Sequence, residues 1–305
     1  MKTKPCLFLS AICCLSFPGL IPASATACPP LGYDIATLNE LREKHFEITD
    51  TPERQAFARH LLACLNVPDP KLRDRIAYEA YATWRHSKSL DDTTWHFIES
   101  SLVEKLTARK ADPSGVIKPF AVLVLVEAIK ADRASTYLRE DERRPLLDAV
   151  SDYLVALRDY RGFDSDVGWR HGVAHAADLL AELALSPSFG RAEMDRILAA
   201  TAAQIVPTGA HFYIYGESER LGMVLAAVAS RDIYTAEEWE TWLMKIASPA
   251  PFKNWDDAYW SQTGLAKRHN TVSFLLALYA RTSTDKRAAV TVLAPMVIKA
   301  MEPIG

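Results

Sequence analysis

The chain has 305 residues, of which 49% are hydrophobic and 24% charged, so it is long enough to bury a sizeable core as a globular protein. Its formal net charge is −3, and no dense cluster of Lys and Arg offsets the acidic residues. This balance argues against binding to nucleic acid or to an anionic membrane surface. A ligand or a protein is therefore the expected partner.

Residues 1–27 have the three parts of a secretory signal peptide. Lys2 and Lys4 give a positive start, residues 6–21 form an apolar run, and Ala25-Thr-Ala27 is a small-residue cleavage site. The apolar run is shorter than the roughly 20 residues that a membrane-spanning helix needs. The sequence therefore predicts a periplasmic or secreted mature chain, residues 28–305, with no transmembrane segment. Loss of the two lysines changes its formal charge from −3 to −5.

Two cysteines, Cys28 and Cys64, remain after the predicted cleavage. In an oxidising compartment two remaining cysteines indicate one disulfide, which would contribute about 3 to 4 kcal/mol in the chain-entropy model. Two free thiols, or a lipid attached to Cys28, are the alternatives. Simple cleavage is favoured over lipidation because Ala25 stands where the lipoprotein pattern prefers a larger aliphatic residue.

The mature chain carries successive helix signals. Residues 51–52 and 69–70 place a capping side chain before a proline, residues 235–238 have the form of a capping box, and residues 89–92 resemble one. Between these signals the apolar residues are spaced for helices. The exception is residues 211–215, which alternate as a short strand would. We expect an all-α protein with almost no sheet.

Residues 120–126 are apolar on every side, which predicts a central helix that is buried all round. No glycine-rich or charged linker divides residues 28–305, so a single helical domain is expected. Short connectors favour antiparallel neighbours. The predicted fold is an α-solenoid of stacked antiparallel helix pairs, HEAT-like with degenerate repeats, and a closed α/α toroid is the alternative.

Residues 159–185 hold the densest set of reactive side chains. If residues 168–185 form one helix, its two faces differ. One face is an apolar stripe that should pack in the core: Trp169, Val173, Ala176, Leu180 and Leu183. The opposite face is a polar stripe, defined here as His171, His175, Asp178 and Glu182.

The polar stripe has three interpretations, and the first is a metal site. His171 and His175 are four residues apart, so both can face one ion. His171 and Asp178 are roughly 10 Å apart along the axis, so a third ligand must come from another helix. Residues His211, Glu217, Glu219, Asp256 and His269 are available for that role. We expect no cofactor, and keep the two histidines as candidate ligands of a divalent metal.

The second interpretation is a structural network. Asp159 and Arg161 end the preceding helix, residues 164–166 can cap the next one, and Arg161 could pair with Asp178 or Glu182. The third is a groove in which the histidines act as general acid and base, or recognise a ligand. Residues 255–270 add aromatic side chains that could line a sugar or peptide site, although such a spacing is more typical of a core.

Two motifs carry a family resemblance. Asp159-Tyr-Arg-Gly-Phe and Gly168-Trp-Arg-His-Gly-Val-Ala-His-Ala-Ala-Asp-Leu-Leu are similar to motifs of the bacterial domain-of-unknown-function family 2785, and the likeness covers roughly residues 140–285. The resemblance implies an all-helical, repeat-like protein with no assigned activity. Arg170 stands where the family usually has a small residue, and Leu157 where an acidic one is common.

The leading hypothesis is an exported helical-repeat protein that binds a ligand or protein partner through a polar groove around His171, His175 and Asp178. The full set of expected binding residues is Asp159, Arg161, Trp169, His171, His175, Asp178 and Glu182. The alternative is a hydrolase that uses His171, His175 and Asp178 as catalytic residues, with or without a metal.

Overall fold

The computed structural model describes residues 28–109 and 111–305, and the predicted signal peptide lies outside them. The described chain is mostly helical with almost no strand, which confirms the predicted all-α class. Its first half comprises η1 (Pro30–Gly32), α1 (Ile35–Glu43), α2 (Thr51–Leu61), η2 (Leu62–Asn66), η3 (Lys71–Tyr78), α3 (Glu79–Ser87), α4 (Asp92–Thr107), α5 (Ile117–Ala134) and α6 (Glu140–Ala156).

The second half begins with two short strands, β1 (Phe163–Asp164) and β2 (Gly168–Trp169), which pair antiparallel with Phe163 opposite Trp169. The helices that follow are α7 (Gly172–Ala184), α8 (Arg191–Ile205), α9 (Glu217–Ala229), α10 (Ala236–Ile246), α11 (Trp255–Ala258), α12 (Gln262–Thr284), α13 (Ala288–Thr291), α14 (Leu293–Met301) and η4 (Glu302–Ile304).

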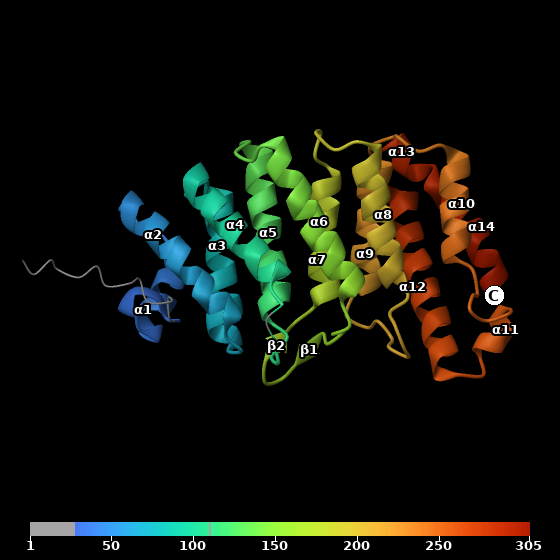
Figure 1. The fold of residues 1–305 in the computed structure, drawn as a ribbon, viewed down its shortest axis with the longest axis horizontal. Helices are drawn as coiled ribbons and strands as arrows, with labels where there is room; N and C mark the ends of the chain where they lie inside the picture. The colour runs from blue at the N-terminus through green and yellow to red at the C-terminus, as the bar shows by residue number, and fades with distance from the viewer. Residues whose placement is uncertain (1–27, 110) are drawn as a thin grey trace, which may run out of the picture.

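The helices form two layers that run along the long axis of the molecule (Figure 1). In one layer α5, α7, α9 and α12 pack one against the next, and in the other α4, α6 and α8 do the same. Each helix of the second layer also packs on its sequence neighbour in the first. The blue N-terminal helices and the red C-terminal helices lie at opposite ends of this array.

α5 lies at the centre of the core, as the apolar run predicts. Phe120, Val122 and Leu125 are fully or almost fully buried, and the helix contacts α3, α4 and α7. Glu127, a buried acid that directly follows the apolar run, pairs with Arg85 of α3 at 2.6 Å. Burial on all sides explains why the segment needs no polar face.

α7 begins at Gly172, so the prediction of a helix from residue 168 is wrong. Gly168 and His171 both have positive φ, 74° and 56°, which breaks the helix, and residues 163–169 form the β1–β2 hairpin instead. Trp169 therefore lies outside the core with 39% of its surface exposed. The other four residues predicted for the apolar stripe are buried.

The predicted caps are partly right. Thr235 and Glu238 form the expected capping box, with the Glu238 N–H donating to Thr235 Oγ1 at 3.2 Å. The cap of α2 is Asp50, not Thr51, and the cap of α4 is Asp91. Residues 211–215 form a loop without strand pairing.

Cys28 and Cys64 form a disulfide, which confirms the predicted pairing and ties the N-terminal arm to η2. The two Cα atoms are 5.0 Å apart. Among the residues described, no helix combines the length and the apolar character needed to cross a membrane.

Candidate functional site

The β1–β2 hairpin and the loop before α9 bring four rings together at one edge of the helix layers, where the strands project in Figure 1. The Trp169 ring lies 5.3 Å from Phe163, 5.7 Å from Tyr215 and 5.0 Å from His171, between ring centroids. Phe163 is 51% exposed. We call Phe163, Trp169, His171 and Tyr215 the aromatic edge.

A buried arginine far away in the sequence holds this hairpin in place. Arg73, on η3, is completely buried and donates hydrogen bonds to the carbonyl oxygens of Val167 at 2.7 Å and Trp169 at 3.3 Å. It also donates to Pro68 O at 2.9 Å and stacks on the Phe120 ring at 4.3 Å. The rigid fork of the guanidinium suits such a set of acceptors.

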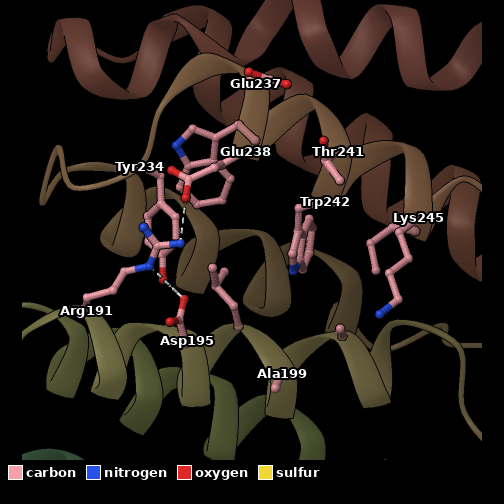
Figure 2. Close-up of a pocket in the computed structure, with 13 residues that line it drawn as sticks. Arg191, Asp195, Ala199, Tyr234, Glu237, Glu238, Thr241, Trp242 and Lys245 are labelled. Atoms are coloured by element: carbon pink, nitrogen blue, oxygen red, sulfur yellow. Dashed lines mark hydrogen bonds and ion pairs between the residues drawn. The ribbon is translucent and has the colours of Figure 1, made fainter.

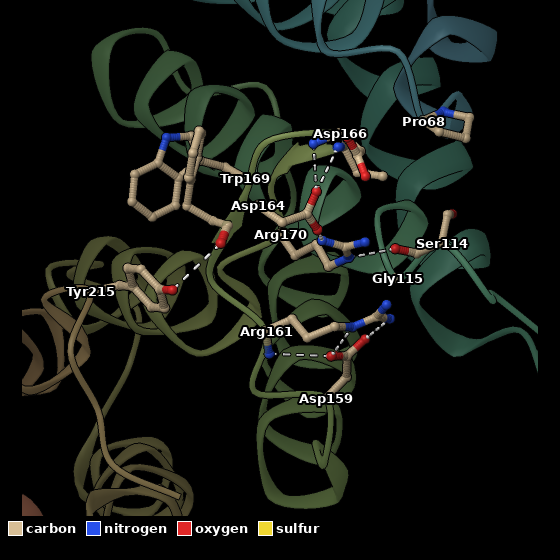
Figure 3. Close-up of polar contacts among 12 residues, drawn as sticks. Pro68, Ser114, Gly115, Asp159, Arg161, Asp164, Asp166, Trp169, Arg170 and Tyr215 are labelled. Atoms are coloured by element: carbon tan, nitrogen blue, oxygen red, sulfur yellow. Dashed lines mark hydrogen bonds and ion pairs between the residues drawn. The ribbon is translucent and has the colours of Figure 1, made fainter.

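A second buried arginine, Arg170, fastens the other side of the hairpin (Figure 3). Its Nε donates to Ser114 O at 2.6 Å, and its Nη1 pairs with Asp164. Asp164 also accepts from the N–H of Val167 at 2.7 Å, and this bond together with Arg170 holds the pKa of Asp164 below its usual value. Asp164 therefore closes the hairpin turn and does not cap α7 as expected.

Asp159 and Arg161 pair with each other (Figure 3), through Nε–Oδ1 at 2.7 Å and Nη2–Oδ2 at 2.5 Å. Burial raises the pKa of Asp159, but the bonds from Arg161 outweigh it and the net shift is downward. The prediction that Arg161 reaches Asp178 or Glu182 is wrong.

The carboxylates of the polar stripe instead join α7 to its neighbours in the same layer. Asp178 pairs with Arg220 of α9 at 2.6 Å, and Glu182 pairs with Arg133 of α5 at 2.6 Å. Burial raises the pKa of Asp178 in spite of Arg220. These two residues fit the structural-network interpretation, with partners other than the one that the sequence suggested.

The two histidines are held as neutral rings. His175 is almost fully buried, its Nδ1 donates to Pro119 O at 3.1 Å, and burial lowers its pKa to about 3, with His171 adding to the effect. Burial also lowers the pKa of His171, against a hydrogen bond with the Tyr215 backbone. The Nε2 atom of His171 is buried and has no hydrogen-bond partner among the described residues.

The donor set around the histidines lacks a third metal ligand. Their ring centroids are 5.6 Å apart, but Asp178 and Glu182 are engaged by arginines. Within residues 28–109 and 111–305, no group of three or more His, Cys, Asp or Glu side chains is placed to hold one ion.

The predicted groove does not follow the polar stripe, because α5 and α9 pack against α7 and leave His175 buried and the Asp178 side chain 16% exposed. A cavity of about 250 Å³ borders Glu182, and another of about 220 Å³ borders Asp159. A larger one, about 600 Å³, lies between α8 and α10 (Figure 2).

Sequence reasoning missed Arg73, and it considered Tyr215 and Arg220 only as groups that could line the groove, without assigning their partners. Arg73 is 94 residues from its acceptor Val167, and Arg220 is 42 residues from Asp178. Arg170 could have indicated such contacts from the sequence. A charged side chain at a position where the family usually has a small residue needs hydrogen-bond acceptors if it is buried.

No curated protein and no solved structure matches the chain. Residues 102–280, which are 179 of the 305, match the family described as "Protein of unknown function (DUF2785)". The matched segment contains α5 to α9 and the aromatic edge. The match covers more than half of the chain, and the protein belongs to the DUF2785 family.

Proposed function

We propose that this protein is an exported binding protein that recognises a ligand or protein partner through the aromatic edge. The observation that carries the proposal is the exposure of Phe163 and Trp169 on a hairpin that two buried arginines, Arg73 and Arg170, hold in place. Exposed aromatic rings on loops held by a rigid scaffold are typical of binding sites.

The groups around these rings suit recognition. Tyr215 hydrogen-bonds Phe163 O through its hydroxyl at 3.4 Å, which fixes the relative position of the two loops. The exposed Asp159–Arg161 pair supplies a charged rim. Little ordering entropy is lost when a preorganised surface binds, so more of the contact energy appears as affinity.

The scaffold in this proposal is one domain, residues 28–305, built as an open α-solenoid of stacked antiparallel helix pairs. The two layers and the position of the first and last helices at opposite ends of the array support an open form over a closed toroid. The Cys28–Cys64 disulfide supports export, because disulfides persist in oxidising compartments.

Affinity capture with purified wild-type and variant proteins tests the binding proposal. Partners retained by the wild type should be lost with Phe163→Ala and Trp169→Ala, and the affinity for a purified partner should fall at least about tenfold, or about 1.4 kcal/mol. Trp260→Ala is the matched control, since Trp260 is 88% exposed on the distant segment between α11 and α12. Equal loss in the control, or no loss in either variant, would refute the proposal.

A hydrolase remains the second candidate, and the neutral His171 with its free Nε2 is the observation that favours it. Turnover of a panel of ester, peptide and phosphoester substrates, tested with and without added zinc or manganese, would reveal it. An activity that His171→Ala abolishes without unfolding the protein would establish the enzyme; an activity that survives this change would rule His171 out as its base.

A further inference from the structure

The α8–α10 groove is the cavity lined by residues of α8, by residues of α10 and by Tyr234 (Figure 2), and its lining includes no residue of the aromatic edge. Its volume of about 600 Å³ is within the range of small-ligand sites, roughly 300 to 1,000 Å³. Leu198, Ala199 and Ala202 of α8 face Trp242 and Ile246 of α10 across it. Apart from Thr241, the lining between its two ends is therefore apolar.

One end of the groove is fixed by an arginine. Arg191 donates to Asp195 at 3.0 Å and to Glu238 of α10 at 2.7 Å, and its guanidinium stacks on the Tyr234 ring at 4.1 Å. The Tyr234 hydroxyl donates to Asp195 at 2.7 Å. These contacts join α8 to α10 at this end and keep the groove walls at a set distance.

The two ends of the groove carry opposite charge. Asp195 and Glu238 line the first end with Arg191, so two carboxylates face one cation there. Lys245 lines the other end. Glu238 and Lys245 are seven residues apart on α10, or about 10 Å along a helix axis.

A ligand that complements the groove has an apolar body between a cationic and an anionic end about 10 Å apart. An extended peptide of three residues matches this length at roughly 3.3 Å per residue, and its free termini carry these charges. We propose that the α8–α10 groove binds short apolar peptides, with the amino group at the acidic end and the carboxylate near Lys245.

Calorimetric titration of the purified mature protein with the tripeptide Leu-Phe-Leu tests this site. The free peptide should bind, and both the N-acetylated and the C-amidated forms should bind at least about tenfold more weakly. Lys245→Glu should weaken the free peptide and leave the amidated form unaffected, and Trp242→Ala should weaken all three. Lys245 is exposed, so its variant should fold even if Trp242→Ala does not.

Trp169→Ala, on the aromatic edge, is the control that separates the two sites, and it should bind the peptide like the wild type. No binding of Leu-Phe-Leu, or equal binding of the free and blocked forms, would overturn the proposal. So would a fatty acid or an amphipathic helix that occupies the groove in a Trp242-dependent way while the peptide does not.

Discussion

Asp178 and Arg220 join α7 to α9, but they differ in burial. The Asp178 side chain is 16% exposed and that of Arg220 is 45% exposed. The pKa of Asp178 is raised because burial disfavours the charged carboxylate more than the ion pair with Arg220 favours it. The contribution of this pair to stability should therefore depend on which partner is removed.

Asp178→Asn should change the free energy of unfolding by less than about 1 kcal/mol, because Arg220 can be hydrated and an amide can still accept its hydrogen bond. Arg220→Ala should cost about 2 kcal/mol at pH 8, since it leaves a buried carboxylate without its cation. Near pH 4 that cost should shrink because Asp178 takes up a proton. Urea denaturation at both pH values measures these differences. Equal losses of unfolding free energy in the two variants would show that the difference in burial does not determine the effect.

His175 should make stability fall in acid. Its pKa is lowered from 6.5 to about 3 in the folded protein, so between these pH values the unfolded chain binds a proton and the folded chain does not. Stability is therefore lost as pH falls from 6.5 towards 3, by up to about 1.4 kcal/mol per pH unit. Urea denaturation of His175→Gln from pH 7 to 4 should show a flatter slope than the wild type. The exposed His86→Gln should keep the wild-type slope, and a wild-type slope in His175→Gln would show that this ring does not control acid stability.

At the scale of elements, we expect the hydrogen bonds from Arg73 to stabilise the β1–β2 hairpin more than the few backbone hydrogen bonds between its two short strands do. Arg73→Lys keeps the charge but lacks the fork that reaches the carbonyls of Pro68, Val167 and Trp169. It should cost at least about 2 kcal/mol and speed amide exchange within residues 163–169. Arg161→Ala, which removes an exposed pair from the same loop, should cost less than about 1 kcal/mol. Unchanged amide exchange in Arg73→Lys would show that the hairpin is stable without the Arg73 hydrogen bonds.

The helices could be predicted because their sequence patterns are local. The disulfide could be predicted because only one pairing of the cysteines was possible. Apolar spacing identified the helix through residues 120–126, and two remaining cysteines can pair in only one way. The start of α7 could not be predicted in this way, because the residues from 168 onward also fit a helical pattern, and tertiary bonds from Arg73 override it. The partners of Asp178 and Glu182 depend on which helices pack side by side, which no local pattern encodes.

At the scale of the whole molecule, each helix in the layer of α5, α7, α9 and α12 contacts the next, so the array grows in one direction (Figure 1). A compact chain of 278 residues, 305 less the predicted signal of 27, would have a radius of gyration of about 19 Å. Small-angle X-ray scattering of the mature protein should give a clearly larger radius and a skewed distance distribution, because the helices extend along one axis. A closed toroid would give a value near the compact one with a symmetric distribution, and that result would contradict the open solenoid.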